Sequence, residues 1–347
     1  MGLKKAAFNI WIRCYLYNNK YILYLRRKGK CSNKKWLYNL ILGISLPYIV
    51  LRWGVLVVYE NIFGKKRIFC DMKRERNKSF KYEMAMVAIA KNEGPYIREW
   101  IEHHKLIGFT KFYLYDNESD DDTRLLLSPY IDSGLVEYTF FPGKMRQLDA
   151  YNDAIERHKN ECRWMAFLDV DEFIMPTVPF KPITEIVSDI VYNSGKGAVG
   201  LGINWVVYGS SNFKEKPQGF VMDNFLHRSE KTHWSCFMVK TICNPRMVAY
   251  YISPHYPLYK TGGYSVSESD GKRQYGWFHH NVTYKNVRIN HYFTKSRQEY
   301  VKKRNRGLAD RLGQYDMAMF DKYDLNDIYD ESMKVYSAKI KKNLGIC

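Results

Sequence analysis

Four short apolar segments that alternate with helical patterns constrain the fold of this chain more than any other feature. The segments cover residues 84–90, 111–115, 135–141 and 164–168. Each is too short for an ordinary globular helix and is bounded by polar residues, which is typical of a buried strand. Apolar residues at helical spacing predict helices over 96–107, 123–131 and 145–158, the first with Pro95 in its opening turn. Strands that alternate with helices over about 90 residues predict an α/β unit with a largely parallel sheet.

Polar clusters follow three of these strands. They are KNE at 91–93, DNESDDD at 116–122 and DVDEF at 169–173. Ligands of such a sheet bind outside the carboxyl ends of the strands, so we expect the three clusters to lie on one rim. DNESDDD taken alone fits a solvated turn equally well. DVDEF does not, because two carboxylates next to a buried strand are costly unless a positive group joins them.

Asp169 and Asp171 are the acidic pair of DVDEF. In an extended segment, side chains two residues apart point to the same side and can share one ion. Carboxylate oxygens suit Mg²⁺ or Mn²⁺, and these ions commonly bridge the phosphates of a bound nucleotide. The sequence therefore predicts a site for a metal ion and a diphosphate at the end of the fourth strand.

The run from 88 to 176 resembles the GT-A glycosyltransferases, on the strength of AIAKNEGPYIREWIEHHKLIGFTKFYLYDNESDD, RQLDAYNDAI and FLDVDEF. Within that group it is most similar to glycosyltransferase family 92 and to related family 2 enzymes. INHYFTKSRQEYVKKRNRGLAD, at 289–310, resembles the carboxyl-terminal motif of the same group. The resemblance covers about 84–311. It implies a GT-A fold, an α/β and Rossmann-like arrangement in which helices flank a mostly parallel central sheet.

The resemblance also implies a donor site. The residues that would hold the nucleotide base and ribose are Ala90, Asn92, Glu93 and Asp116. The helix residues that would face the donor are Arg146, Gln147, Asp149 and Asn152. Asp169 and Asp171 would hold Mn²⁺ or Mg²⁺ and the donor sugar, and His291 would complete the metal shell. Lys295 and the basic run 302–304 would steady the departing diphosphate by charge.

Purely structural roles for the same residues remain as alternatives. Asn92, Glu93 and Asp116 also fit turn and capping roles, and His291 also fits a structural histidine. The basic run 302–304 also fits a solvated helical face.

An inverting transfer requires a general base on the acceptor side of the site. Asp223, in GFVMDNF, is the candidate, because it resembles the acid that follows an apolar strand in family members; Glu215 and Glu230 are alternatives. Aromatic residues between 202 and 259 are expected to shape the acceptor pocket, since aromatic faces stack on sugar C–H surfaces.

The first 79 residues carry most of the net charge. They contain 18 Lys and Arg against three acids, whereas the whole chain has a formal charge of +18. Within them, residues 36–59 hold 24 residues with a single Arg, close to the length of a spanning helix. Basic residues flank both sides, which favours a segment lying in or dipping into an anionic membrane surface; a transmembrane helix and a buried helix pair are the alternatives.

These features predict three regions. A basic, partly hydrophobic, helical and membrane-associating region covers 1–79, and a hydrophilic linker at 70–81 leads out of it. A glycosyltransferase domain covers 80–311, and a helical tail covers 312–347. The seven cysteines form no CxxC pair, and no secretory signal is visible. We therefore expect a location on the cytoplasmic face of a membrane, the inner membrane of a bacterium.

The predicted function is that of a metal-dependent glycosyltransferase. It would move a hexose, galactose or a related sugar, from a UDP-sugar to a glycan or lipid-linked acceptor in surface polysaccharide or lipopolysaccharide biosynthesis, with inversion. One alternative is a non-catalytic protein that binds polyanions or membranes and keeps a vestigial nucleotide site. Another is a nucleotidyltransferase, which lacks support because no Gly-rich, Lys-containing loop follows the first strand. Nucleic acid is not an expected partner, because the sequence has no zinc finger or RNA-recognition signature.

Overall fold

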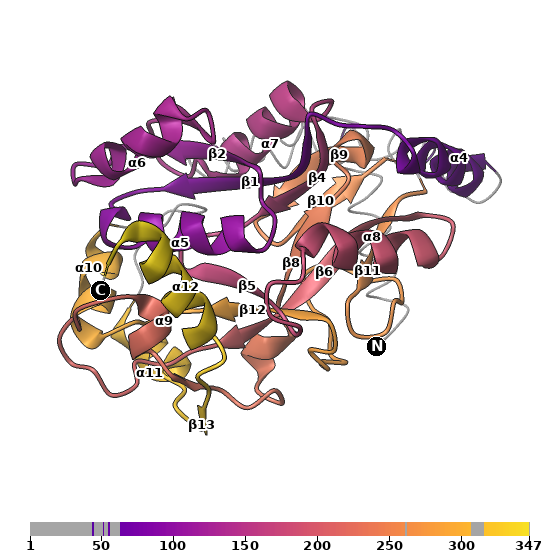
Figure 1. The fold of residues 1–347 in the computed structure, drawn as a ribbon. Coiled ribbons are helices and arrows are strands. Elements are labelled where there is room, and N and C mark those ends of the chain that lie inside the picture. Colours follow the sequence, from indigo (N-terminus) through magenta and orange to yellow (C-terminus); the bar gives the residue numbers. More distant parts are fainter. Residues whose placement is uncertain are drawn as a thin grey trace.

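A nine-stranded mixed sheet forms the centre of the molecule in the computed structural model (Figure 1). The structure describes residues 44, 51, 55, 63–260, 262–306 and 316–346. Along the sheet the strands lie in the order β3-β2-β1-β4-β8-β6-β12-β5, and β11 pairs with β6. The sheet with helices around it confirms the predicted α/β class.

The first four strands form the parallel part of this sheet. They are β1 (Tyr82–Ala90), β2 (Lys111–Asp116), β3 (Val136–Phe140) and β4 (Cys162–Phe167). The helices between them are α5 (Gly94–Leu106), α6 (Thr123–Asp132) and α7 (Gln147–His158). β1 lies between β2 and β4 and runs parallel to both, and its last seven residues are buried. The seven predicted elements are confirmed, each to within two residues at either end.

The second part of the sheet mixes directions. Its strands are β5 (Glu172–Pro176), β6 (Ala198–Val207), β8 (Val239–Cys243), β11 (Tyr264–Ser267) and β12 (Val287–His291). β8 is antiparallel to both β4 and β6, whereas β12 is parallel to β6 and antiparallel to β5. All ten residues of β6 are buried, so this strand forms the centre of the second part.

Smaller elements surround the sheet. They are α8 (Ile183–Asn193), α9 (Val221–Asn224), α10 (Arg297–Asn305), α11 (Met317–Tyr323), α12 (Lys334–Leu344), the 3₁₀ turns Trp234–Phe237 and Pro245–Met247, and the strands β7 (His227–Arg228), β9 (Val248–Ser253), β10 (Tyr256–Tyr259) and β13 (Ile328–Tyr329). α12 packs against α5 and α9, and its Tyr336 is fully buried. The carboxyl-terminal segment is therefore helical and part of the folded body.

Helix α4 (Lys65–Arg76) replaces much of the predicted linker at 70–81. Ile68 and Met72 are buried under it, and the Glu75 carboxylate accepts hydrogen bonds from Arg246 Nε at 2.7 Å and Nη2 at 2.8 Å. Arg163 Nη1, at the start of β4, donates to the Glu75 carbonyl at 2.8 Å. The linker prediction was wrong, because these contacts fix a charge-rich helix to the amino-terminal end of the sheet. α4 lies before the predicted domain boundary at residue 80 and still packs on the domain.

The membrane-anchor prediction for 36–59 falls almost entirely outside the described residues. Ile44, Leu51 and Val55 are described there, and all three are helical and exposed. Within the ranges that the structure covers, no helix is long and apolar enough to cross a bilayer. The four described cysteines, Cys70, Cys162, Cys236 and Cys243, form no disulfide.

Candidate functional site

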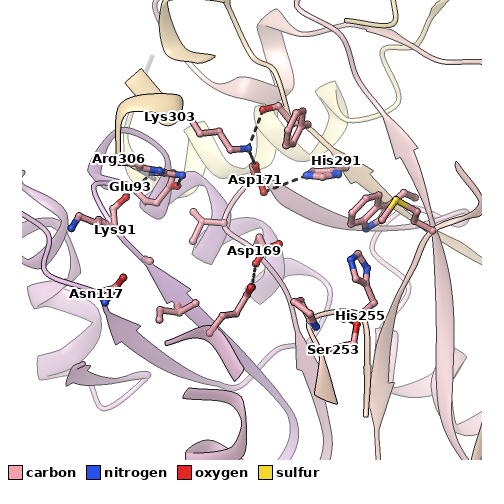
Figure 2. A pocket seen from close by; sticks show the side chains of 18 of the residues that line it. Lys91, Glu93, Asn117, Asp169, Asp171, Ser253, His255, His291, Lys303 and Arg306 are labelled. Atoms are coloured by element: carbon pink, nitrogen blue, oxygen red, sulfur yellow. Dashed lines mark hydrogen bonds and ion pairs between the residues drawn. The ribbon is translucent and has the colours of Figure 1, made fainter. Parts of the chain in front are cut away.

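A cavity of about 960 Å³ opens at the carboxyl ends of the parallel strands (Figure 2). From β1 and the residues after it come Ala90, Lys91 and Glu93; from the loops after β2 and β4 come Asn117, Glu118, Asp169 and Asp171. His291, at the end of β12, and Lys303, on α10, reach the same cavity from the second half of the chain. The prediction that the three polar clusters share one rim is confirmed.

The first two clusters are tied to each other by hydrogen bonds. The Asn92 amide donates to Ser119 Oγ at 2.9 Å, and Asn92 Oδ1 accepts from the Asp120 amide at 2.9 Å. The Gly94 amide donates to Asp121 Oδ2 at 3.0 Å. Asn92 has a φ of 55°, in the left-handed region that asparagine tolerates better than most residues. Asn92 and Asp121 therefore shape the rim rather than project into the cavity, whereas Glu118 of the same loop lines it.

DVDEF forms a tight turn between β4 and β5. The Glu172 amide donates to the Asp169 carbonyl at 3.1 Å, which closes the turn. The two aspartates consequently face different partners. Asp169 accepts from Gln147 Nε2 at 2.6 Å, whereas Asp171 Oδ1 lies 3.6 Å from His291 Nε2. The expectation of an extended segment with parallel side chains was wrong, because the chain reverses here to start an antiparallel return.

Asp171 and His291 meet in a buried part of the cavity (Figure 2). Burial by itself raises the pKa of the Asp171 carboxyl, but the Lys303 ammonium, 2.5 Å from Oδ2, and His291 hold it well below its ordinary value. Burial lowers the pKa of His291, which favours the neutral imidazole. An ionised carboxylate 3.6 Å from a neutral imidazole nitrogen is a donor pair that fits a Mn²⁺ or Mg²⁺ ion.

Asp169, the third predicted ligand, lies in the same cavity but is held by other groups. Its Oδ2 accepts from Lys240 Nζ at 3.0 Å. Among the residues that the structure covers, no group of three or more His, Cys, Asp or Glu side chains has the arrangement of a metal site. Asp171 and His291 thus lie close enough to share one ion, whereas Asp169 would need to turn toward them, and the three-ligand metal site stays a prediction.

Lys240 is a buried cation between two acids. Its side chain is 1% exposed, and its Nζ lies 3.0 Å from Asp169 Oδ2 and 3.2 Å from Glu172 Oε2. Burial by itself lowers the pKa of Lys240, but the two carboxylates outweigh it and raise that pKa well above its ordinary value. Lys240 therefore supplies a positive group to the fully buried Glu172 and to the partly exposed Asp169. Sequence reasoning missed it, although a lone lysine in the apolar strand VKTIC was an available signal.

Helix α10 brings two further cations to the rim. Ser296 and Glu299 form a capping box at its start, which fixes the first turn. At its other end, Lys303 contacts Asp171, and Arg306 Nη2 lies 2.5 Å from Glu93 Oε1. Both cations line the cavity. Within the basic run 302–304, Lys303 therefore does not belong to a solvated helical face.

Several residues that the resemblance assigned to the donor make structural contacts instead. Asp116 accepts from the Ser119 amide at 3.1 Å and from the Tyr138 hydroxyl at 2.5 Å. Asn152 binds both the carbonyl and the amide of Tyr251, at 3.0 and 2.7 Å. Neither side chain is among those that line the cavity. Asp116 and Asn152 thus hold the surrounding loops in place.

Arg146, Asp149 and Lys295 also lie outside the cavity lining. Arg146 donates to Asp149 at 2.9 Å and stacks over Phe141 with its guanidinium 4.2 Å from the ring centre. Lys295 Nζ lies 4.1 Å from the centre of the Tyr96 ring. Of the helix residues, only Gln147 reaches the cavity, at the amino terminus of α7.

Asp223, the candidate base, lies away from this cavity. It sits in the short helix α9, and its Oδ2 lies 2.8 Å from Lys341 Nζ on α12. It is not among the residues that line the cavity, so the structure does not bring it to the donor site. Acids that do line the cavity are Glu93, Glu118, Asp169 and Asp171.

Part of the cavity lining is aromatic, and two of these side chains, Trp205 and Phe293, lie against His291. The lining includes Trp205, Trp234, Tyr256, Trp277, Phe278, Phe293 and Tyr323. His255 lies among them, 5.2 Å from Trp205 and 5.9 Å from Trp277 between ring centres. His255 Nδ1 faces the Val239 carbonyl at 3.0 Å and must carry the proton, so Nε2 keeps its lone pair. Burial lowers the pKa of His255 to about 3, which leaves the ring neutral.

Comparison with known proteins assigns this chain to a family. A family model described as glycosyltransferase family 92 matches residues 85–318. A glycosyltransferase family 92 protein of Arabidopsis thaliana is 33% identical over 105 residues, which are 29% of this chain and 18% of that protein. One from Ricinus communis is 28% identical over 140 residues, which are 39% of this chain and 24% of that protein. The matched segments thus span no more than about a quarter of these curated relatives.

Solved structures show more distant likenesses. S. aureus TarS 1–349 in complex with UDP has a TM-score of 0.33 and 14% identity over 48% of this chain and 47% of that one. Glucosyl-3-phosphoglycerate synthase from M. tuberculosis in complex with Mn²⁺, UDP-glucose and phosphoglyceric acid has a TM-score of 0.26 and 17% identity over 36% of this chain and 44% of that one. Similarity at these TM-scores does not show which ligands this chain binds.

Proposed function

This chain belongs to glycosyltransferase family 92, and we propose that it is a metal-dependent transferase of a hexose from a UDP-sugar donor. The hexose is galactose or a related sugar, and the acceptor is a glycan or a lipid-linked glycan of surface polysaccharide or lipopolysaccharide, with inversion at the sugar. The observation that carries the proposal is the buried Asp171–His291 pair in a cavity at the carboxyl ends of parallel strands. Family membership supports the reaction type.

The donor occupies the strand end of the cavity in this proposal. The nucleoside lies along the rim formed by Ala90, Lys91 and Asn117, where β1 and β2 end. The diphosphate lies toward Asp171 and His291, which would hold the metal ion, and toward the cations of α10. When bound, the metal supplies positive charge that stabilises the diphosphate as its bond to the sugar breaks.

The acceptor occupies the aromatic part of the cavity. Trp277 is 46% exposed and offers a ring face on which a sugar can stack. The neutral His255 can accept a hydrogen bond at Nε2 from an acceptor hydroxyl, which orients that hydroxyl toward the donor sugar. These two features support a carbohydrate acceptor rather than a second nucleotide.

We expect UDP to bind the purified full chain only in the presence of Mn²⁺ or Mg²⁺, because Lys303 and Arg306 are already paired with acids of the cavity and a metal ion would add the positive charge that a diphosphate needs. Calorimetry with UDP, ADP and GDP and with the corresponding triphosphates, with and without Mn²⁺, measures this, and UDP-hexoses then identify the donor. Mn²⁺-dependent UDP binding with slow UDP-galactose hydrolysis supports the transferase. Binding of a nucleoside triphosphate with release of pyrophosphate favours the nucleotidyltransferase. Absence of any nucleotide binding by a folded sample favours the non-catalytic polyanion binder.

We further propose that α4 lies on an anionic membrane surface at the cytoplasmic face. Its exposed basic residues are Lys65, Lys66, Arg67, Lys73, Arg74 and Arg76, and Glu75 is neutralised by Arg246. Phe63 and Phe69 are exposed beside them, 55% and 43% respectively. Exposed apolar and basic side chains together are typical of an interfacial segment.

We expect the charge reversal K66E/R67E/K73E to lower binding of the full chain to liposomes containing phosphatidylglycerol by more than about tenfold, since each basic residue near such a surface contributes about 1 kcal/mol. Flotation at low and high salt measures the bound fraction. The control K231E/K285E/K339E makes the same change in charge at exposed lysines outside α4. Equal loss in both variants would show a general charge effect, and no loss in either would contradict the membrane role of α4.

A further inference from the structure

Lys303, on α10, is paired with the carboxylate of Asp171, which is the group that the metal ion is expected to bind. Lys303 Nζ donates to Asp171 Oδ2 at 2.5 Å and to the Phe293 carbonyl at 3.0 Å. The side chains of Lys303 and Asp171 are only 12% and 7% exposed. The ammonium and the carboxylate therefore form an ion pair that water hardly screens.

Lys303 and a metal ion would compete for the same carboxylate, that of Asp171. Asp171 Oδ1 faces His291, and Oδ2 carries Lys303, so a single carboxylate lies between the two expected cations. A divalent ion bound there would lie next to an ammonium in a poorly screened site, and the two positive charges would repel each other. The flexible lysine stem allows the ammonium to move while the helix stays in place.

The neighbouring contacts indicate where the ammonium would go. Arg306, one turn further along, lies on Glu93 and donates to the Lys91 carbonyl at 2.6 Å, on the nucleoside side of the cavity. Lys303 and Arg306 both line the cavity, and the diphosphate of a bound donor lies between the nucleoside and the sugar. An ammonium leaving Asp171 is therefore within the same space as the diphosphate.

We propose that Lys303 is an internal counter-ion of Asp171 that a divalent ion displaces, and that the displaced ammonium then binds the donor diphosphate. This inference rests on the proposed function. Metal and nucleotide would then bind cooperatively, because the diphosphate takes up the cation that the metal has displaced. Lys303 would weaken metal binding to the free protein and strengthen nucleotide binding to the metal-loaded protein.

Calorimetric titration of the full chain with Mn²⁺ alone, and then with UDP at saturating Mn²⁺, tests both effects. K303M is expected to bind Mn²⁺ about tenfold more tightly than the unmodified protein and to bind UDP about tenfold more weakly. K302M is the matched control, since Lys302 is the preceding residue of the same helix and is exposed. It is expected to change either affinity by less than about twofold. Unchanged or weaker Mn²⁺ binding by folded K303M would overturn the inference.

A measurement on the unmodified protein keeps the test decisive if K303M does not fold. Acylation of lysines by an N-hydroxysuccinimide ester, followed by mass spectrometry, reports the availability of each amine. Mn²⁺ alone is expected to raise the labelling rate of Lys303 severalfold, and addition of UDP is expected to lower it again, with Lys302 unaffected. Labelling of Lys303 that does not respond to Mn²⁺ would overturn the inference.

The outcomes separate this inference from the proposed function. If the unmodified protein binds UDP with Mn²⁺ but Lys303 shows neither effect, the inference fails and the proposed function stands. If the unmodified protein binds neither Mn²⁺ nor UDP, the proposed function fails and the inference fails with it.

Discussion

D171N is expected to lower sugar transfer by at least about a thousandfold if Asp171 holds the proposed metal ion, because the substitution removes the charged ligand of an ion that would stabilise the leaving diphosphate. The geometry behind this expectation is the Asp171 carboxylate 3.6 Å from His291 at the end of the parallel strands. Transfer of radiolabelled sugar from the donor identified above measures the effect. Calorimetry with Mn²⁺ on the same sample shows whether metal binding is lost with activity.

The same substitution also leaves the Lys303 ammonium without its carboxylate, and breaking a buried pair from one side is costly. The double variant D171N/K303M removes both charges and is expected to recover most of the lost stability while staying inactive. Comparison of the two variants by urea denaturation and by transfer separates the chemical role of Asp171 from its structural one. Transfer by D171N near the unmodified rate would remove the metal assignment.

K240M is expected to lower the free energy of unfolding by about 3–5 kcal/mol, the usual cost of leaving a buried charge without its partner. Lys240 is the cation between Asp169 and Glu172, and the Glu172 side chain is fully buried. The loss is expected to be greater at pH 8 than at pH 5, because burial raises the pKa of the Glu172 carboxyl well above its ordinary value, and protonation of this carboxyl removes its unpaired negative charge as the pH falls. Guanidinium denaturation at the two pH values measures it.

The control for this prediction is K240M/E172Q, which removes one of the two acids together with the lysine. It is expected to be more stable than K240M, because fewer buried charges remain unpaired. A loss below about 1 kcal/mol in K240M would show that solvent reaches these acids and that Lys240 is not their essential counter-ion.

The parallel half of the fold and the position of the site could be predicted because both depend on local patterns. Each strand from β1 to β4 and each intervening helix is encoded in its own residues, and the carboxyl-end rule then places the polar clusters on one rim. The α/β class followed from the same segments, whereas the GT-A fold was implied by the resemblance to known glycosyltransferases. The direction of β8 depended on pairing between distant strands, so the sequence patterns did not indicate it.

Side-chain partners were harder to predict, because they come from distant parts of the chain. Lys240 reaches Asp169 across 71 positions, and Lys303 reaches Asp171 across 132. The turn that separates Asp169 from Asp171 depends on the antiparallel course of β5, which pairs with β12. The docking of α4 likewise depends on Arg246, 171 positions from Glu75. Residue type identified the acids, but only the fold shows which cation each acid meets.

The length of β1 sets the distance between the basic helix α4 and the cavity. α4 joins the sheet at the amino-terminal end of β1, and the cavity opens after its last residue, Ala90 (Figure 1). A strand of nine residues spans about 30 Å, comparable to the hydrocarbon thickness of a bilayer. If α4 rests on lipid, the length of β1 sets the greatest distance between the lipid surface and the cavity. If β1 stands perpendicular to the membrane plane, a lipid-linked acceptor must carry a glycan long enough to cover that distance. A short acceptor would reach the cavity only if the sheet lies parallel to the membrane.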